Sequence, residues 1–263
     1  MQSLKEILEK VSRGEIKPED AEKILKLHAI GELSCLAKLD GNRELRKGIP
    51  EIILAEGKAP LDVVEICRRM LTDFGRVIVS RCSIKHLAAI KTALPNDNVL
   101  EWHEKARIAV LKKKDYEVKV DGGKIAVITA GTSDIPVAEE AKVIAEEMGC
   151  KVYCSYDVGV AGIHRLFDCL KEVISEDVDV IVVVAGREGA LASVVCGLVD
   201  APVIAVPTSN SYGFGKNGLA ALMAMLQSCS LGLAVVNIDG GVAAGAVATV
   251  IANRVAKFRK QKK

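Results

Sequence analysis

Aromatic side chains are scarce in this sequence of 263 residues. Phe, Trp and Tyr make up 3% of the chain, whereas hydrophobic residues as a whole make up 50%. A chain of this length can bury a sizeable core, and that core must be built mainly from Val, Ile, Leu and Ala. The length predicts either one large domain or two smaller ones.

The sequence also lacks an excess of one charge. Its 36 Lys and Arg nearly balance its 34 Asp and Glu, for a net charge of +2. This balance gives no electrostatic case for a nucleic-acid partner. No uninterrupted apolar run has the length of a membrane span, so we expect no membrane partner either.

The eight cysteines contain no CxxC pair. Residues 1–15 have the pattern of a charged amphipathic helix without the apolar centre of a signal peptide, so we expect a cytoplasmic chain with reduced thiols. Cys150 and Cys154 lie four residues apart on a predicted strand, which makes a poor corner for zinc. Free cysteine is usually a small buried hydrophobic residue, and we expect this of seven of the eight, with Cys229 as the exception.

The two halves of the chain differ in pattern. Up to about residue 115 the sequence is charged and mostly helical by pattern, with short strands predicted at 76–80 and 98–102. The polar segment 111–123 closes with two glycines and is the expected boundary. We therefore predict domains at 1–120 and 121–263.

In the second half, continuous apolar segments alternate with helical ones. The predicted strands are 124–129, 151–156, 179–184, 202–206 and 233–238. The predicted helices are 134–148, 162–174, 189–199, 215–228 and 240–257. This alternation is typical of a parallel sheet covered on both faces. The predicted fold class is therefore α/β: a three-layer domain with a parallel sheet, preceded by a smaller, mostly helical α/β domain.

Charge is nearly missing from the end of the chain, where residues 179–256 hold only seven charged side chains in 78. The helical segments 218–226 and 243–252 are apolar nearly all round. A helix of that kind must be buried on all sides, and one α/β domain would leave one face in water. We therefore expect a homo-oligomer.

Polar residues follow the predicted strands, where ligands bind in a parallel α/β sheet. The turn at 131–134 offers the hydroxyls of Thr132 and Ser133 and the N–H groups of a helix start, which suit an anion. The alternative is that Ser133 or Asp134 only caps the helix.

Three further segments carry candidate site residues. His164 and Arg165 suit an anion and a proton shuttle, or else stand exposed at a helix end. Glu188 is a candidate acid or base, or a favourable charge at the next helix start. The loop at 207–218 is long enough to be functional, and its Lys216 either meets a phosphate or is solvated.

The fifth candidate is Cys229, between two serines at a predicted helix-to-strand corner. A free cysteine there is either a packed side chain or a nucleophile facing a cleft. Asn237 and Asp239 follow the strand after it.

Taken together, these motifs resemble two related families. Gly131-Thr-Ser-Asp134 and Gly162-Ile-His-Arg165 are similar to the G-S-x-S-D and S-A-H-R segments of the PurE-type aminoimidazole ribonucleotide carboxylases. The LarB family, which works in nickel-pincer nucleotide synthesis, matches more closely and over nearly the whole chain. Its pattern includes A-G-x-x-R, A-G-x-E-G-A-L, P-T-S and S-C-x-P-G-x-x-V-V-N-I-D. The corresponding segments here are Ala161-Gly-Ile-His-Arg165, Ala185-Gly-Arg-Glu-Gly-Ala-Leu191, Pro207-Thr-Ser209 and Ser228-Cys-Ser-Leu-Gly-Leu-Ala-Val-Val-Asn-Ile-Asp239, where Leu231 replaces the proline.

The LarB resemblance implies a PurE-like carboxyl-terminal domain and a specific reaction. That reaction is carboxylation of nicotinic acid adenine dinucleotide at the pyridinium C5, with cleavage of its phosphoanhydride to give pyridinium-3,5-biscarboxylic acid mononucleotide and AMP. It implies Cys229 as nucleophile and Glu188 and His164 as acid or base. CO2 or bicarbonate is the implied co-substrate, Mg²⁺ the implied ion with Asp134 and Asp239 as ligands, and no organic cofactor is held tightly. The PurE-like fold suggests an octamer. The implied substrate contacts are Gly131, Thr132, Ser133, Asp134, Arg165, Gly186, Ser209, Asn237 and Asp239.

The first half of the chain resembles the LarB segment L-D-x-x-R-x-x-R-x-G-x-P-E. Asp40, Arg43 and Arg46 lie on one helix face at a spacing of three, either as a solvated, salt-bridged face or as a ligand or interdomain site. The same two alternatives, a solvated surface role or a ligand or interdomain site, apply to Glu51 and Lys58. Two rival functions remain open: an aminoimidazole ribonucleotide carboxylase or mutase, which needs no thiol, and a non-catalytic nucleotide-binding or assembly module.

Overall fold

The computed structural model describes residues 4–31, 47–93, 98–120 and 122–261, and these divide into two compact units. The first unit, Met1–Glu51, contains the helices α1 (Leu4–Ser12) and α2 (Pro18–Gly31). Proline lacks an N–H, so it fits the first turn of α2, where Glu19 and Asp20 add favourable negative charge. The second unit is Ile52–Lys263. The predicted boundary at residue 120 stays a prediction.

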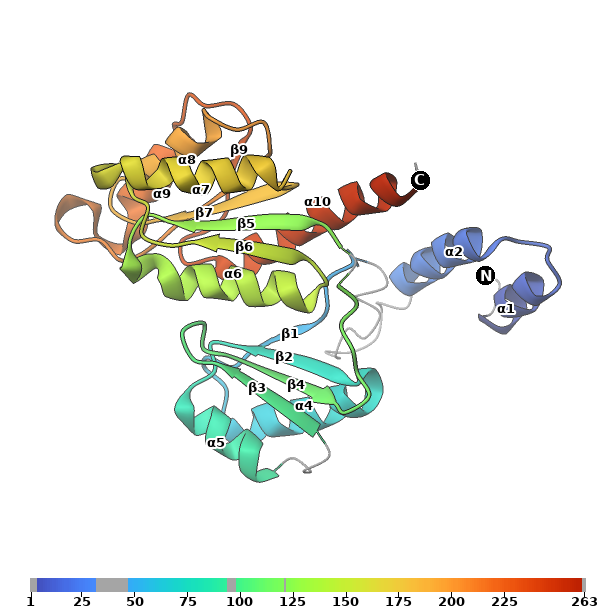
Figure 1. Ribbon diagram of the computed structural model, residues 1–263. Helices are drawn as coiled ribbons and strands as arrows, with labels where there is room; N and C mark the ends of the chain where they lie inside the picture. The colour runs from blue at the N-terminus through green and yellow to red at the C-terminus, as the bar shows by residue number, and fades with distance from the viewer. Residues whose placement is uncertain (1–3, 32–46, 94–97, 121, 262–263) are drawn as a thin grey trace. The chain divides into compact units, whose positions relative to one another are not determined.

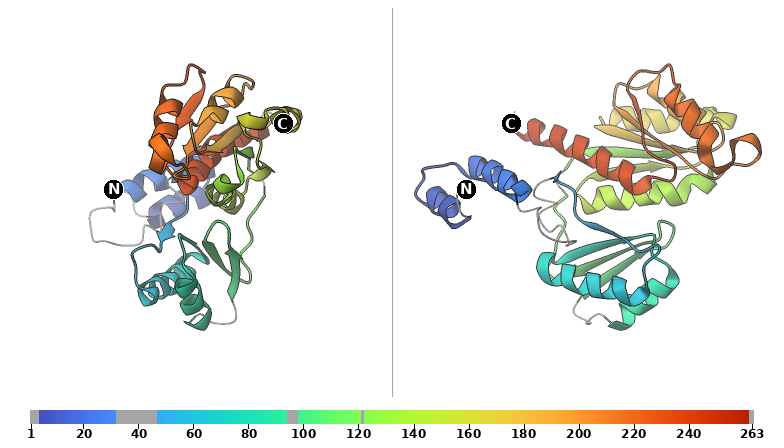
Figure 2. Two further views of the ribbon diagram at one scale, coloured as in Figure 1. Left: turned by 90° about the vertical axis from the view of Figure 1, so that its left-hand side faces the viewer. Right: turned by 180° about the vertical axis from the view of Figure 1, so that it is seen from behind.

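The second unit begins with a four-stranded sheet whose strand order is β1-β2-β4-β3. β1 and β2 are parallel, and the other two pairs are antiparallel. The helices α4 and α5 pack against each other, and α4 also packs on β2; both are seen from behind in Figure 2. The bounds are β1 Ile52–Leu54, α4 Pro60–Phe74, β2 Arg76–Ser80, α5 Ile84–Ala93, β3 Asn98–His103 and β4 Ile108–Lys113.

A five-stranded parallel sheet follows, with the strand order β6-β5-β7-β8-β9. β7 and β8 are buried along their whole length, as the apolar sequence of a sheet covered on both faces requires. The strands are β5 Lys124–Thr129, β6 Lys151–Ser155, β7 Val180–Ala185, β8 Val203–Pro207 and β9 Leu233–Val235.

Helices cover both faces of this sheet (Figure 1). Ala138 of α6 and Ala244 and Ala248 of α10 pack over one face with Val127 and Val182. On the other face, α7, α8 and α9 bury a second cluster around the side chains of β5 and β7. The helices are α6 Ile135–Glu147, α7 His164–Ser175, α8 Ala190–Cys196, α9 Leu219–Leu226 and α10 Gly241–Gln261.

A buried charged network links α6 to the first sheet. Glu147, at the end of α6, accepts a hydrogen bond from Lys112 Nζ at 2.6 Å and forms an ion pair with Arg76 at 3.5 Å. Arg76 also donates to the Glu147 carbonyl, and Lys112 lies 3.2 Å from Glu101. Burial by itself would lower the pKa of Lys112, but its hydrogen bonds and ion pairs with Glu147 and Glu101 outweigh burial and raise it. The network therefore holds Lys112 charged.

The structure confirms the α/β class, the parallel five-stranded sheet and the smaller α/β part that precedes it. It adds three elements that the sequence did not predict, namely β1, α5 and β4. β9 ends at Val235 rather than 238, and the chain turns at Ile238 and Asp239, where Asp239 takes a left-handed φ of 55°. Within the described residues, no helix combines the length and apolar character that crossing a bilayer requires.

Candidate active site

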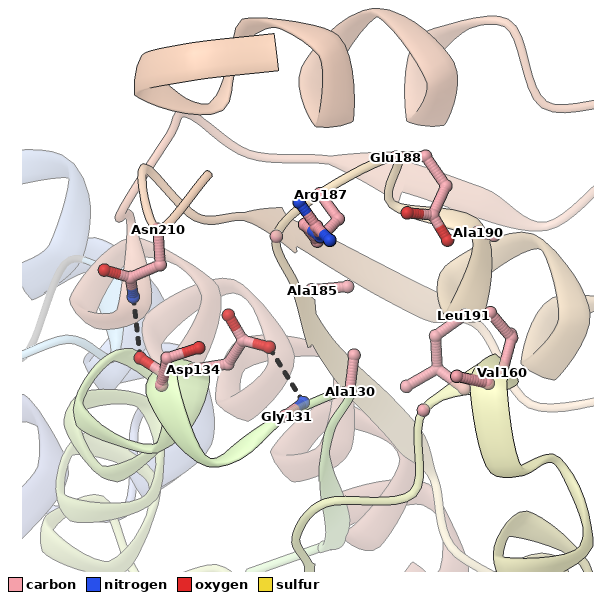
Figure 3. Close-up of a pocket in the computed structure, with 14 residues that line it drawn as sticks. Ala130, Gly131, Asp134, Val160, Ala185, Arg187, Glu188, Ala190, Leu191 and Asn210 are labelled. Atoms are coloured by element: carbon pink, nitrogen blue, oxygen red, sulfur yellow. Dashed lines mark hydrogen bonds between the residues drawn. The ribbon is translucent and has the colours of Figure 1, made fainter. Parts of the chain in front are cut away.

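A cleft of about 330 Å³ opens at the carboxyl ends of the parallel strands (Figure 3). It includes the point between β5 and β7 where the strand order reverses, which is the usual ligand site of such sheets. The chain segments that follow β5, β6, β7 and β8 all contribute to its wall. Of the predicted site residues, the cleft is lined by Gly131, Ser133, Asp134, Gly186 and Glu188.

Asp134 ties two of these segments together. Its Oδ2 accepts the Gly131 N–H at 3.0 Å, and its Oδ1 accepts the Thr208 hydroxyl at 2.7 Å. Burial raises the pKa of Asp134, and the hydrogen bonds from Thr208 and Gly131 oppose that rise. Thr208 is fully buried just after β8 and was not singled out from the sequence. The carboxylate thus fixes the turn after β5 to the end of β8.

The turn after β7 carries Arg187 and Glu188 over the cleft (Figure 3). The Gly189 N–H closes the turn on the Gly186 carbonyl at 2.9 Å. Gly186 is required, because a Cβ atom there would lie 2.7 Å from the Thr208 hydroxyl. Arg187 itself adopts a φ of 52°, which is uncommon for a residue with a side chain.

The segment after β8 adds Asn210 to the cleft; this residue lies in the loop predicted to be functional but was not itself named as a site residue. Its Nδ2 donates to the Ser133 carbonyl at 2.6 Å. Beside it, the Ser209 N–H donates to Asp239 Oδ1 at 2.9 Å. Ser209 and Asp239 therefore brace this segment and do not line the cleft wall. Asn237 is exposed, and its side-chain oxygen accepts the N–H of Ile238.

His164 and Arg165 begin α7 and are exposed. The residues just before them, from Gly159 to Ala161, line the cleft, but neither His164 nor Arg165 does. Arg165 Nη1 forms an ion pair with Asp157 Oδ2 at 2.6 Å. Thr132 is also exposed and lies outside the lining residues.

Cys229 lies at the opposite edge of the sheet from the cleft. It precedes β9, whose first residue Leu233 pairs with Val203, the first residue of β8. The cleft follows the last residues of the strands, so the two places are separated by about the length of a strand, roughly 17–20 Å. One chain does not bring Cys229 together with Glu188.

Hydrogen bonds anchor the corner that carries Cys229. The hydroxyl of Ser193, on α8, donates to Ser228 Oγ at 2.9 Å, and Ser230 Oγ donates to the Ser193 carbonyl at 2.8 Å. The flanking serines are therefore held against α8, and Cys229 between them is exposed. The thiol of Cys229 therefore lies at the surface of the chain, on a corner that hydrogen bonds hold in place.

The other described cysteines are mostly buried. Burial raises the pKa of Cys67 to about 12 and the pKa of Cys82 and Cys150 to about 11, so these thiols stay protonated at neutral pH. Cys169 and Cys196 are buried as well. Cys154 is exposed, so the prediction that only Cys229 escapes burial is wrong for it. It lies on β6, an edge strand of the sheet, which explains its exposure.

The described residues contain no group of three His, Cys, Asp or Glu side chains placed to hold a metal ion. Both oxygens of Asp134 and one oxygen of Asp239 already accept hydrogen bonds. With these oxygens engaged, Asp134 and Asp239 do not fit as ligands of a cation bound permanently to the protein. An Mg²⁺ ion held largely by substrate phosphates, as is usual for Mg²⁺, stays a proposal.

The structure describes two of the five candidate residues of the first half, Glu51 and Lys58. Asp40, Arg43 and Arg46 fall outside the described residues. Glu51 ends the first unit. Lys58, in the second unit, donates to the Leu54 carbonyl at 2.7 Å, which serves the loop before α4.

Glu140 on α6 is a titrating group near Asp239 and the start of α10. Burial raises the pKa of Glu140 from 4.5 to about 7, and the charge of Arg81 opposes that rise. A raised carboxyl pKa stabilises the fold in the protonated form, so this contribution is complete below pH 4.5 and lost as the pH rises through about 7.

We therefore expect wild type to lose on the order of 2 kcal/mol more stability than E140Q between pH 5 and pH 8. Urea unfolding at both pH values measures the difference. The exposed Glu172 provides the control, and E172Q should behave as wild type does. An E140Q variant with the pH dependence of wild type would contradict the assignment.

Comparison with known families divides the chain into two matched regions. Residues 30–114 match the LarB/PurE-like N-terminal domain, and residues 124–262 match AIR carboxylase. The second match alone covers more than half of the chain.

Comparison with individual proteins gives the same picture. An uncharacterized protein of Methanocaldococcus jannaschii is 43% identical over 254 residues, which is 95% of this chain and 97% of that protein. The N5-carboxyaminoimidazole ribonucleotide mutase of Pyrococcus abyssi is 32% identical over 139 residues, covering 51% of this chain and 76% of the mutase. The mutase of Thermotoga maritima is 30% identical over 108 residues, covering 40% and 59%.

Proposed function

The chain belongs to the LarB family, with an AIR carboxylase domain at its carboxyl-terminal end, and we propose that it carboxylates the pyridinium C5 of nicotinic acid adenine dinucleotide. An enzyme of the carboxylase or mutase type follows from the family matches. The specific reaction rests on one observation: a LarB-type amino-terminal region precedes a cleft that carries Glu188 at the switch point of the sheet. The products are pyridinium-3,5-biscarboxylic acid mononucleotide and AMP, for nickel-pincer nucleotide synthesis.

The chemistry explains why a thiol is needed. The pyridinium ring is electron-poor, and its C5 does not attack CO2. Addition of the Cys229 thiolate at C4 forms a C–S bond and makes C5 an enamine carbon, which then forms a C–C bond to CO2. Loss of the C5 proton to Glu188 and expulsion of the thiolate restore the aromatic ring. Cysteine suits both steps because a thiolate is a good nucleophile and a good leaving group.

The other residues have proposed roles in binding. The turn at 131–134 and the backbone at Gly186 hold the phosphoribosyl part, and Arg165 and His164 approach the second phosphate or move a proton. Ser209, Asn237 and Asp239 support this substrate region. An Mg²⁺ ion held by the substrate phosphates would supply positive charge beside the anhydride that water cleaves. No organic cofactor is needed, and a reducing cytoplasm would keep the thiol free.

A second copy of the chain supplies the thiol in this proposal. Cys229 and Glu188 lie at opposite edges of one sheet, so one chain cannot hold both at the same ring. The outer face of α9 supports an oligomer, because Leu219, Met223 and Leu226 are 50%, 56% and 66% exposed. Exposed apolar side chains at this helical spacing form a surface suited to a partner. The PurE-like fold suggests that the homo-oligomer is an octamer.

The main alternative is an N5-carboxyaminoimidazole ribonucleotide mutase, favoured by the two mutase relatives and by the absence of a thiol from the described cleft residues of one chain. A non-catalytic nucleotide-binding or assembly module is the other. Offering the purified protein nicotinic acid adenine dinucleotide with bicarbonate and Mg²⁺, and N5-carboxyaminoimidazole ribonucleotide separately, distinguishes all three. We expect turnover of the dinucleotide alone; turnover of the ribonucleotide alone, or of neither, would overturn the proposal.

A further inference from the structure

Arg187 is a cation in the cleft that the proposed mechanism does not use. We infer that Arg187, held in place by Tyr212, forms a subsite for the carboxylate on the substrate ring and so selects a nicotinate over a nicotinamide. This inference rests on the proposed function and adds to it the group that distinguishes the substrate. The residue occupies the variable position of the A-G-x-E-G-A-L pattern, so the motif itself does not assign it a role.

Arg187 has no counter-ion in the described part of the chain. It is the single Lys, Arg or His among the described residues that line the cleft, and no described carboxylate lies within 4.0 Å of its guanidinium. Nearby cations are engaged, Arg165 with Asp157 and Arg81 with Glu56. A cation without a partner at the wall of a ligand cleft is a site for an anion.

A tight backbone turn and an aromatic ring fix the position of this guanidinium. The left-handed φ of 52° at Arg187 is held by the tight turn between Gly186 and Gly189. The guanidinium carbon lies 4.1 Å from the centre of the Tyr212 ring. Stacking on an aromatic ring covers one face of the guanidinium and leaves the N–H donors at its edge free.

The surroundings favour a carboxylate over a phosphate. The turn at 131–134 and Gly186 are proposed to hold the phosphoribosyl part, so Arg187, on the turn after β7, is left for the group carried by the ring. A planar carboxylate also matches the two parallel N–H donors of an arginine edge. Val160 and Leu191 give the cleft an apolar wall for the ring that carries the carboxylate (Figure 3).

The test compares two ligands that differ only in the group concerned. Titration calorimetry of the full-length oligomer measures the Kd of nicotinic acid mononucleotide and of nicotinamide mononucleotide. We expect wild type to prefer the acid by about 10- to 100-fold, the range for one charge-assisted contact. R187M should bring the two affinities within about 3-fold by weakening the acid alone. Y212F should keep the preference and Y212A should reduce it, because only the ring is needed for stacking.

The control is R69M, which removes an exposed arginine on α4 that pairs with Asp73. It should keep the preference of wild type. If R187M retains the wild-type preference, the subsite is wrong. It is also wrong if R187M loses affinity equally for both nucleotides, as it would if Arg187 contacted the phosphate. In either case the proposed function stands. If wild type binds neither nucleotide, the subsite is wrong, whereas turnover of the dinucleotide still decides the proposed function.

Discussion

Co-expression of the C229A and E188Q variants is expected to restore carboxylation that neither variant supports alone. Removing a covalent nucleophile should lower turnover at least about 1,000-fold, and removing the proton acceptor should lower it about 100-fold or more. In the mixed oligomer, some sites combine Glu188 from a C229A chain with the thiol of an E188Q chain. Random assembly gives such sites roughly a quarter of the total, so about a quarter of wild-type turnover should return.

The recovery follows from the placement of the two residues at opposite edges of the sheet. Light scattering must show that the mixed sample and each variant form the same oligomer as wild type. Two orthogonal affinity tags, purified in sequence, confirm that both chains are present. A monomeric wild-type protein, or a mixed oligomer that stays inactive, would contradict a site shared between copies.

Substitution of Glu147 is expected to have the largest effect on stability. E147Q keeps the shape of the side chain but removes the negative charge that faces Arg76, which is 5% exposed. Lys112 also loses the closest of its ion pairs. Removing one partner from a buried ion pair costs about 3–5 kcal/mol, so E147Q should lower the free energy of unfolding by roughly that amount.

The neighbouring Glu146 provides a matched control because it is exposed. E146Q should change the free energy of unfolding by less than about 0.5 kcal/mol. Urea denaturation of the three proteins at one pH makes the comparison. An E147Q variant as stable as E146Q would show that the network does not hold the first sheet to α6.

Most of the parallel sheet could be predicted from sequence because β5, β7 and β8 are continuous apolar runs separated by helical segments. The first sheet was harder to predict. β1 is three residues long, and β4 ends in lysines whose polar character resembles the linker that follows. Both strands pair with β2 through contacts distant in sequence.

The cleft residues were predictable for a different reason. Gly131, Asp134, Gly186 and Glu188 directly follow predicted strands, and the carboxyl ends of parallel strands share one edge. Cys229 follows a helix and precedes a strand, and such corners lie at the other edge. The motif around Cys229 indicated a nucleophile, but it did not show where that thiol lies relative to the cleft.

The sequence pointed less clearly to the residues that support the site. Thr208 and Asn210 flank Ser209 directly after β8, so the same edge rule could have included them. Arg187 gave no signal of its own, because its importance depends on the turn at Gly186 and on Tyr212, which lies 25 positions later in the chain.

The most direct test of the central claim follows labelled carbon. The protein is incubated with nicotinic acid adenine dinucleotide, Mg²⁺ and ¹³C-bicarbonate, and the products are separated and examined by mass spectrometry and carbon NMR. We predict a mononucleotide carrying one ¹³C-carboxylate at ring C5, with one AMP released for each carboxylation and no product from C229A. AMP release without label in the ring, or labelled product from C229A at the wild-type rate, would contradict the account.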